Sequence, residues 1–252
     1  MSTHNQVSFV LASTDQGTLI VNRNDFRILG QTAIGVGYQL LSKSHYDEEE
    51  LLFLEHTLND IRSKNGKGIV VVDCGANIGV HTISLAIKMR GWGSVIAVEP
   101  QERLFYALCG NIALNNCTNA RAIWSAVGAE VGSMQAPLPD YTRPGSFGSL
   151  ELRIGETTEY IGQSISYIDR EMVLVPTITI DSLCLSRLDL MKVDVEGMEE
   201  DVIRGAKETI LRHKPLIFAE WIKTKREVIE SLLSEFGYNK FTQVNGNILA
   251  EI

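Results

Sequence analysis

A short apolar segment that runs directly into a glycine-bearing turn constrains the fold more than any other feature of the sequence. Gly68–Asp73 (GIVVVD) is rich in β-branched residues, which are typical of a strand buried on both faces. Cys74–Gly79 (CGANIG) follows at once, and a helical pattern of apolar residues then runs from Val80 to Ile87. A strand, a tight turn and a helix in this order predict the first unit of a parallel, helix-flanked sheet.

The alternation of strand-like and helix-like stretches continues along the chain. Further strands are predicted, with helical patterns among them, at Ser94–Glu99, Ala120–Trp124, Leu188–Val193 and Pro215–Ala219. The last two strand-like runs, Lys240–Val244 and Asn247–Glu251, are joined by Asn245-Gly246, which is the strongest short signal of a β-hairpin. We therefore expect an α/β fold with a mostly parallel sheet and a C-terminal antiparallel hairpin.

Two stretches do not fit this alternation. Residues 1–60 contain strand-like runs at Val7–Leu11 and Thr18–Asn22 and an acidic-capped helix at Asp47–Ile61. Residues 133–172 are rich in Gly, Ser, Tyr and charged residues and are too long for a bare connection. We expect residues 1–62 to form an N-terminal extension packed on one domain, residues 63–252, with an inserted hairpin or lid at about 133–172 near the working face.

Composition and charge exclude several classes of function. The chain has 23 Lys and Arg against 31 Asp and Glu, a net charge of −8, so nucleic acid is not an expected partner. No stretch has the apolar length of a membrane span, and residues 1–10 lack the pattern of a signal peptide. The 4 cysteines are scattered, with no C-x-x-C pair, as is typical of buried thiols in a reducing compartment. We expect a cytoplasmic protein, and the sequence carries no signal of its oligomeric state.

Acidic residues follow most of the predicted parallel strands. In chain order they are Asp73, Glu99, Asp194 with Glu196, and Glu220, whereas Ser125-Ala126 follows Ala120–Trp124. Open α/β sheets bind ligands outside the carboxyl ends of their strands. The sequence therefore predicts a ligand site rich in carboxylates at this edge of the sheet.

The glycine turn has the pattern G-x-N-x-G at Gly75, Asn77 and Gly79, not the G-x-G-x-x-G of dinucleotide sites. Backbone N–H groups at the start of the following helix can receive one carboxylate. Asp73 can accept hydrogen bonds from an ammonium group or from the turn, and Glu99, 26 residues further on, can accept both hydroxyls of a ribose. A ligand with a ribose, an ammonium and a carboxylate but no pyrophosphate is S-adenosylmethionine. An NAD-dependent oxidoreductase is disfavoured by the missing dinucleotide pattern.

Together these motifs resemble the FkbM family of methyltransferases. The resemblance is carried by VVDCGANIGVHT, VIAVEP, TITIDSL, LDLMKVDVEGMEEDVIRGA and PLIFAEW, in this order over roughly residues 69–222. It implies a class I, Rossmann-like fold whose seven-stranded sheet has an antiparallel last strand. It also implies methyl transfer from S-adenosylmethionine, mostly to oxygen, with nitrogen acceptors also possible.

The resemblance assigns roles residue by residue. The matching positions are Asp73, Gly75, Ala76, Asn77 and Gly79 in the cofactor loop, His81 and Thr82 beside the methionine carboxylate, Glu99 with Pro100 at the ribose, Ser125 and Ala126 beside the adenine, and Asp194, Glu196 and Gly197 in a D-x-E-G signature. Residues 1–60 and 133–172 match no motif, and we expect them to determine substrate choice.

Methyl transfer from a sulfonium requires in-line alignment of the reacting atoms and exclusion of water. A hydroxyl or amide acceptor also needs a base for its proton. Asp194 and Glu196 are the first candidates and Glu220 is the next, whereas His81 is expected to serve the cofactor carboxylate. A metal ion on the same three acids is an alternative, but no residue pattern requires it and we expect none.

We expect an enzyme that methylates an oxygen of a small molecule, a glycan or a modified peptide. N-methylation on the same fold and a non-catalytic S-adenosylmethionine-binding regulator are the alternatives, and the acids on the acceptor side argue against the regulator. Glu196 also stands at a helix start, where the helix dipole favours a carboxylate, so structural and catalytic roles both remain open for it.

Overall fold

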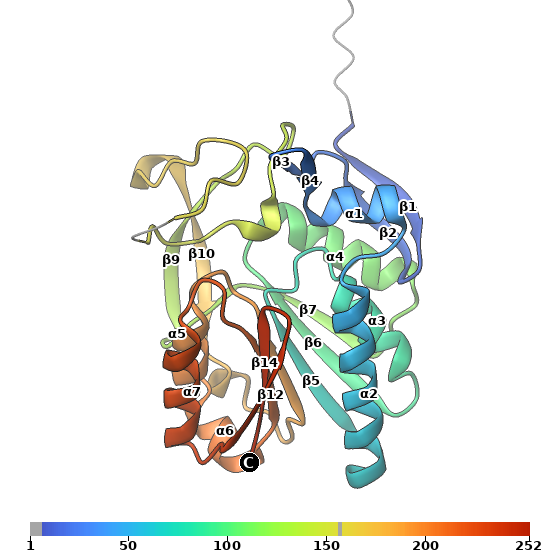
Figure 1. Cartoon of the computed structure of the whole chain (residues 1–252), viewed down its shortest axis with the longest axis vertical. Helices are drawn as coiled ribbons and strands as arrows, with labels where there is room; N and C mark the ends of the chain where they lie inside the picture. The colour runs from blue at the N-terminus through green and yellow to red at the C-terminus, as the bar shows by residue number, and fades with distance from the viewer. Residues whose placement is uncertain (1–6, 156–157) are drawn as a thin grey trace, which may run out of the picture.

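The computed structural model, which describes residues 7–155 and 158–252, is organised around a seven-stranded sheet (Figure 1). In sheet order the strands are β13 (Lys240–Val244), β14 (Asn247–Glu251), β12 (Leu216–Glu220), β11 (Leu190–Val193), β5 (Ile69–Cys74), β6 (Gly93–Glu99) and β7 (Ala120–Trp124). Strands β5, β6, β7, β11 and β12 are parallel, and β14 runs antiparallel between β12 and β13. The predicted α/β fold and its C-terminal antiparallel hairpin are confirmed.

Helices cover both faces of this sheet, which explains why its strands are nearly continuous apolar runs. They are α1 (Val36–Lys43), α2 (Glu48–Asn65), α3 (Val80–Lys88), α4 (Glu102–Leu114), α5 (Glu199–Arg204), α6 (Lys207–His213) and α7 (Arg226–Glu235). Val71 and Phe218 pack on one face in the same cluster as apolar residues of α2 and α3. Their neighbours in sequence, Val72 and Ile217, point to the opposite face and pack with α5, α6 and α7.

The helix expected after β11 is divided in two at Gly205. A Cβ atom at Gly205 would lie 2.1 Å from the carbonyl oxygen of Gly128, so only glycine allows these two backbones to approach. Val202, Ile203 and Ile210 are nevertheless fully buried, as their helical spacing predicts. The break therefore interrupts the helix without changing which side chains enter the core.

Apart from α2, which runs toward the bottom of Figure 1, the two stretches outside the alternation lie mostly in the upper part of that view. The N-terminal one contains the antiparallel pairs β1 (Phe9–Thr14) with β2 (Gly17–Asn22) and β3 (Arg27–Leu29) with β4 (Thr32–Ile34). The other begins and ends in a small separate sheet of β8 (Ala126–Val127), β10 (Met172–Ile178) and β9 (Gly132–Pro137). Between β9 and β10, the described residues of 138–171 have 3₁₀ turns at Phe147–Ser149 and Asp169–Glu171 but no strand or longer helix. None of the described helices is both long and apolar enough to cross a membrane.

Candidate active site

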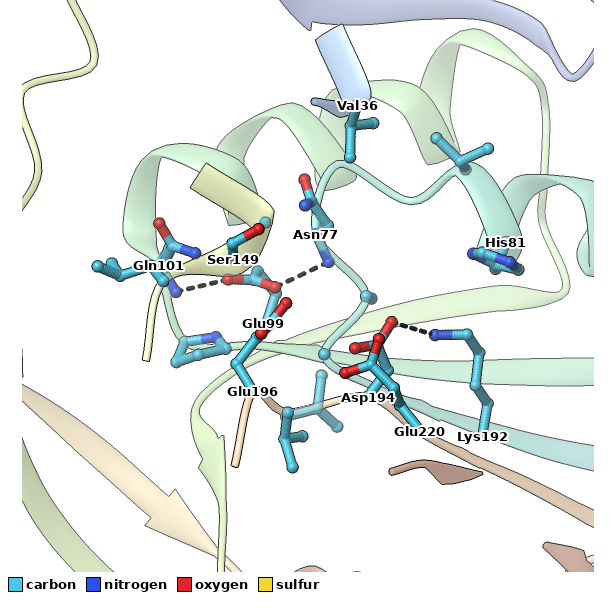
Figure 2. Close-up of a pocket in the computed structure, with 18 of the residues that line it drawn as sticks. Val36, Asn77, His81, Glu99, Gln101, Ser149, Lys192, Asp194, Glu196 and Glu220 are labelled. Carbon is cyan, nitrogen blue, oxygen red and sulfur yellow. Dashed lines mark hydrogen bonds and ion pairs between the residues drawn. The ribbon is translucent and has the colours of Figure 1, made fainter. Parts of the chain in front are cut away.

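A cavity of about 260 Å³ opens at the carboxyl ends of the parallel strands, where the strand order reverses between β5 and β11. Figure 2 shows its centre, with side chains from the glycine turn, from the ends of β6, β11 and β12 and from the irregular segment converging on one space. Its lining includes Val36, Tyr46, Asp47, Glu50, Gly75, Ala76, Asn77, His81, Glu99, Pro100, Ser125, Ala126, Ser149, Leu150, Leu152, Lys192, Asp194, Glu196, Glu220 and Asn247.

The glycine turn is pressed against the exit of β11. Gly75 has a φ of +81°, and a Cβ atom there would lie 1.7 Å from the carbonyl oxygen of Asp194. Gly79 has a φ of +91° and begins α3, and a Cβ atom there would lie 2.5 Å from Leu108 of α4. Glycine is therefore required at both positions by conformation and by space. The turn holds the first turn of α3 against the ligand edge of the sheet.

The Glu99 carboxylate is fixed at the end of β6 by two backbone groups. The N–H of Asn77 donates to Oε2 at 2.7 Å, and the N–H of Gln101 donates to Oε1 at 2.7 Å (Figure 2). Its side chain lines the cavity although the residue is only 3% exposed. Burial raises the pKa of Glu99 to about 7 in spite of the two N–H donors. The group is therefore oriented before any ligand arrives, and its charge changes near neutral pH.

A buried lysine in the lining of the cavity lies between two acids. Lys192 on β11 is 2% exposed, and its Nζ lies 2.9 Å from Oδ2 of Asp194 and 4.0 Å from Oδ1 of Asp73. The other oxygen of Asp73 accepts a hydrogen bond from the Thr82 hydroxyl at 2.6 Å. Burial opposes the charged form of Lys192, but the carboxylates around it raise its pKa well above the usual range. Lys192 therefore holds Asp194 in place as a permanent cation.

Three carboxyl groups meet in the cavity at the exits of β11 and β12. Asp194, Glu196 and Glu220 each present an oxygen atom, and these atoms lie within 4.8 Å of one another. Figure 2 shows the three side chains directed toward one another across the exits of β11 and β12. Burial first and the neighbouring carboxylates second raise the pKa values of Glu196 and Glu220 above the usual range for glutamate. The arrangement can therefore accept a proton near neutral pH.

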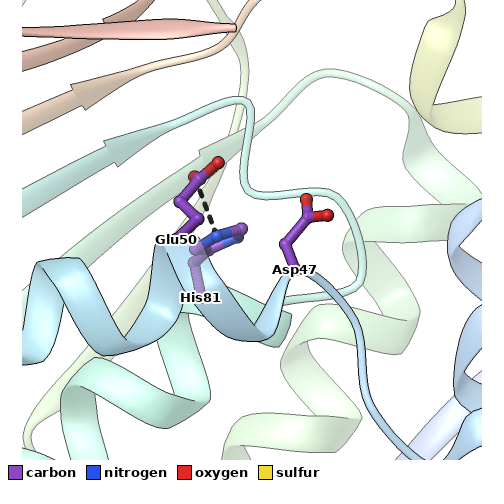
Figure 3. A group of neighbouring side chains, drawn as sticks. All are labelled: Asp47, Glu50 and His81. Carbon is purple, nitrogen blue, oxygen red and sulfur yellow. Dashed lines mark ion pairs between the residues drawn. The ribbon is translucent and has the colours of Figure 1, made fainter. Parts of the chain in front are cut away.

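An ion pair joins α3 to α2 beside the same cavity (Figure 3). Nε2 of His81 lies 3.0 Å from Oε1 of Glu50, and Oε2 of Glu50 accepts a hydrogen bond from the Asn247 side chain at 3.0 Å. Burial alone would raise the pKa of Glu50, but His81, Lys192 and Asn247 together lower it to about 2. Asp47 lies close by and completes a cluster of ligand atoms within 4.8 Å of one another. The imidazole of His81 is therefore already engaged by a carboxylate from the N-terminal stretch.

The structure gathers most of the sequence-predicted residues around one cavity but not all of them. Those lining it are Gly75, Ala76, Asn77, His81, Glu99, Pro100, Ser125, Ala126, Asp194, Glu196 and Glu220. Asp73, Gly79 and Thr82 are not among the lining residues, and support it through the contacts above. The Ser125 hydroxyl is used within the protein, since it donates to the carbonyl oxygen of Pro176 at 2.7 Å.

Lys192, Asp47 and Glu50 were not predicted as site residues. A signal for Lys192 was available: a charged residue inside an apolar strand, two positions before Asp194, projects from the same face of the sheet. Asp47 at the N-cap of α2 and Glu50 in its first turn look like ordinary acids at a helix start. Their position beside His81 depends on the packing of α2 against α3, which no local pattern encodes.

This strand order, with a glycine turn after β5 and an acid at the end of β6, defines a class I methyltransferase fold. The chain belongs to the FkbM methyltransferases, because the family model described as the methyltransferase FkbM domain matches residues 73–240. The resemblance seen in the sequence is thus confirmed, and the protein is a methyltransferase.

Two curated relatives are also methyltransferases by name. Methyltransferase sdnD of Sordaria araneosa is 26% identical over 196 residues, which cover 67% of this chain and 73% of that protein. Methyltransferase 1 of Beauveria bassiana strain ARSEF 2860 is 27% identical over 150 residues, which cover 54% of this chain and 57% of that protein. The second match therefore spans little more than half of the relative.

A solved structure shares the fold. The crystal structure of methyltransferase FkbM from Methylobacillus flagellatus KT aligns with a TM-score of 0.50 and 18% identity. The alignment covers 73% of this chain and 43% of that one. At this identity the likeness concerns the fold alone.

Proposed function

We propose that this enzyme transfers the methyl group of S-adenosylmethionine to a hydroxyl group of a small-molecule, glycan or modified-peptide acceptor. The observation that carries the proposal is that one cavity holds Glu99 at the end of β6 and the three acids at the ends of β11 and β12. The first suits the ribose of the cofactor, and the second suits an acceptor that must lose a proton.

The residues present fit S-adenosylmethionine. A carboxylate offers about four acceptor sites, and the two backbone donors on Glu99 leave capacity for two ribose hydroxyls. Gly75 lines the cavity, and because it has no Cβ atom the turn can lie directly against the Asp194 carbonyl at the exit of β11. The cofactor would supply an electrophilic methyl group on a cationic sulfonium, and the acidic lining of the cavity complements that charge. Asp73 and Thr82 would hold the glycine turn from below.

Asp194, Glu196 and Glu220 form the acceptor end of the cavity, where the acceptor would bind, and the three acids would have different roles. Asp194 is paired with Lys192 at 2.9 Å and would orient the acceptor hydroxyl. Glu196 or Glu220 would take its proton, because their raised pKa values match a base that works near neutral pH. Leu150 and Leu152 would help to exclude water from the reacting atoms.

We also propose that residues 63–252 form a single methyltransferase domain, on which residues 1–62 pack as an extension. Residues 1–62 and the insertion at about 133–172 would together form the walls of the acceptor site. Val36, Tyr46 and Asp47 from the first stretch and Ser149, Leu150 and Leu152 from the second line the cavity. Their composition would therefore select the acceptor.

Calorimetric titration tests the cofactor assignment. We expect S-adenosylmethionine and S-adenosylhomocysteine to bind and NAD not to bind, and Glu99→Ala to weaken both sulfur ligands. Failure of both sulfur ligands to bind to the wild-type protein would overturn the proposal.

Turnover on a hydroxylated acceptor panel tests the chemistry, with product mass and site of methylation as the readout. We expect Asp194→Asn, Glu196→Gln and Glu220→Gln each to lower turnover while cofactor binding persists. Methylation found only on nitrogen would assign the N-methyltransferase alternative, and binding without turnover on any acceptor would favour the regulator. Loss of turnover in a chelator, restored by Mg²⁺, would assign the activation of the acceptor to a metal ion.

A further inference from the structure

One lysine joins three separate parts of the chain at the edge of the cavity. Lys223 lies in the loop after β12 and its side chain is 13% exposed. Its Nζ lies 3.2 Å from Oε1 of Glu151, 2.9 Å from Oε2 of Glu159 and 3.0 Å from Oε2 of Glu196. It also donates a hydrogen bond to the carbonyl oxygen of Ser149 at 3.1 Å.

These partners belong to segments that are distant in sequence. Ser149, Glu151 and Glu159 lie in the irregular segment between β9 and β10, whereas Glu196 lies in the turn after β11. Glu159 also pairs with Arg27 of β3. The Lys223 ammonium thus ties the irregular segment to the acceptor acids, and through Glu159 to the N-terminal stretch.

The electrostatics make Lys223 hard to replace. The Glu196 carboxylate faces Asp194, Glu199 and Glu220, all of which are acids, and Lys223 is its ion-pair partner among the described residues. Glu151 and Glu159 add two more negative charges to the same ammonium group. Without Lys223 these carboxylates would repel one another, and they would relieve the repulsion by separating or by taking up protons.

The contacts reach the cavity itself. Ser149, Leu150 and Leu152 line it on one side and Glu196 lines it on another. We propose that Lys223 is a positioning residue for methyl transfer, which fixes the wall formed by residues 149–152 against Glu196 and holds the Glu196 side chain in place. This inference rests on the proposed function, in which Glu196 belongs to the acceptor end.

Lys223→Met and Lys223→Arg, studied as ligand-free full-length protein, test the proposal by two readouts. In Lys223→Met we expect amide hydrogen exchange in residues 147–152 to accelerate about tenfold or more. We also expect the Glu196 carboxyl signal, assigned in ¹³C NMR with Glu196→Gln, to titrate about one pH unit higher. Lys223→Arg retains the charge and should stay near the wild type in both readouts. If Lys223→Met does not fold, Glu159→Gln, which removes one partly exposed partner, should show a smaller acceleration in the same residues.

Lys240→Met is the matched control, because Lys240 forms an exposed ion pair with Glu251 on the hairpin β13–β14, away from the cavity lining. It should change neither readout. Exchange and titration that remain at wild-type values in Lys223→Met would overturn the inference, as would equal changes in Lys240→Met.

Neither readout requires turnover, so this failure is distinguishable from that of the proposed function, which the cofactor titration decides. Once an acceptor is known, a structural role alone would leave the pH profile of kcat/KM in place, whereas we expect its acid limb to move to higher pH in Lys223→Met.

Discussion

The backbone N–H of Asn77 donates a hydrogen bond to the carboxylate of Glu99 at 2.7 Å, and so joins the glycine turn after β5 to the end of the neighbouring strand. Asn77 has a φ of +54°, a left-handed conformation that asparagine tolerates better than most residues. The bond orients the N–H and the carboxylate at the same time. The proposed ribose contact is therefore built by the turn and the strand together.

Replacing Glu99 should weaken the cofactor selectively. Glu99→Gln retains the shape of the side chain but loses the charge that strengthens hydrogen bonds to ribose hydroxyls. Such bonds contribute about 1.5–3 kcal/mol, so the Kd for S-adenosylhomocysteine should rise roughly 10- to 100-fold. Titration calorimetry measures this. Glu102→Gln, an exposed acid at the start of α4, serves as the control and should bind as the wild type does.

Cofactor affinity should also depend on pH. Burial raises the pKa of Glu99 to about 7 in the ligand-free protein, and ribose hydroxyls bind the ionised form. Below pH 7 the ligand must displace a proton, so affinity should fall as the pH is lowered from 8 to 6 and recover as it is raised. Calorimetry in buffers of different ionisation enthalpy measures both the affinity and the proton released. A wild-type affinity independent of pH in this range would contradict the assignment. The cofactor affinity of Glu99→Gln should vary less with pH than that of the wild type.

Gly75→Ala should disrupt the site. A Cβ atom there would lie 1.7 Å from the carbonyl oxygen of Asp194, and the left-handed φ adds about 1–2 kcal/mol of its own. We expect a loss of more than about 3 kcal/mol of unfolding free energy and no measurable cofactor binding. Gly91 also has a positive φ, but nothing lies within 4 Å of a Cβ atom there. In chemical denaturation, Gly91→Ala should therefore lose only the unfolding free energy that a side chain at positive φ costs, with no contribution from a steric clash.

Lys192→Met tests the buried charge in the cavity lining. Removing one partner of a buried ion pair typically costs about 3–5 kcal/mol, because Asp73 and part of Asp194 lose their counter-charge. Lys88→Met removes a partly exposed pair with Glu55 and should cost under about 1 kcal/mol. Equal losses in the two variants, measured by urea denaturation, would refute the role given to Lys192.

Local patterns predicted those parts of the molecule that depend on local physics. The run Ile69–Val72 forms a strand because both of its faces are buried, and Asn245-Gly246 joins β13 and β14 because its turn suits two antiparallel strands. By the same reasoning, parallel strands place Glu99, Asp194 and Glu220 at one edge of the sheet.

Long-range packing determined the rest. The contact of Glu50 with His81 depends on how α2 lies against α3. The ion pairs of Lys223 with Glu151 and Glu196 depend on the path of the irregular segment over the sheet edge. Side-chain chemistry shows which residues are able to pair, but only the folded chain brings these partners within about 3 Å of each other.

The register of the small sheet has a consequence for exchanging parts between related enzymes. Pro137 at the end of β9 lies directly opposite Met172 at the start of β10, so the irregular segment leaves and rejoins the molecule at neighbouring points. The cost of closing a loop between fixed ends grows only slowly with its length. A segment of different length can therefore be grafted between these two residues, provided that it keeps Tyr141 and Phe147, which are buried in the same core cluster as Val71 of β5. If the segment forms an acceptor wall as proposed, chimeras joined at Pro137 and Met172 should have altered acceptor preferences.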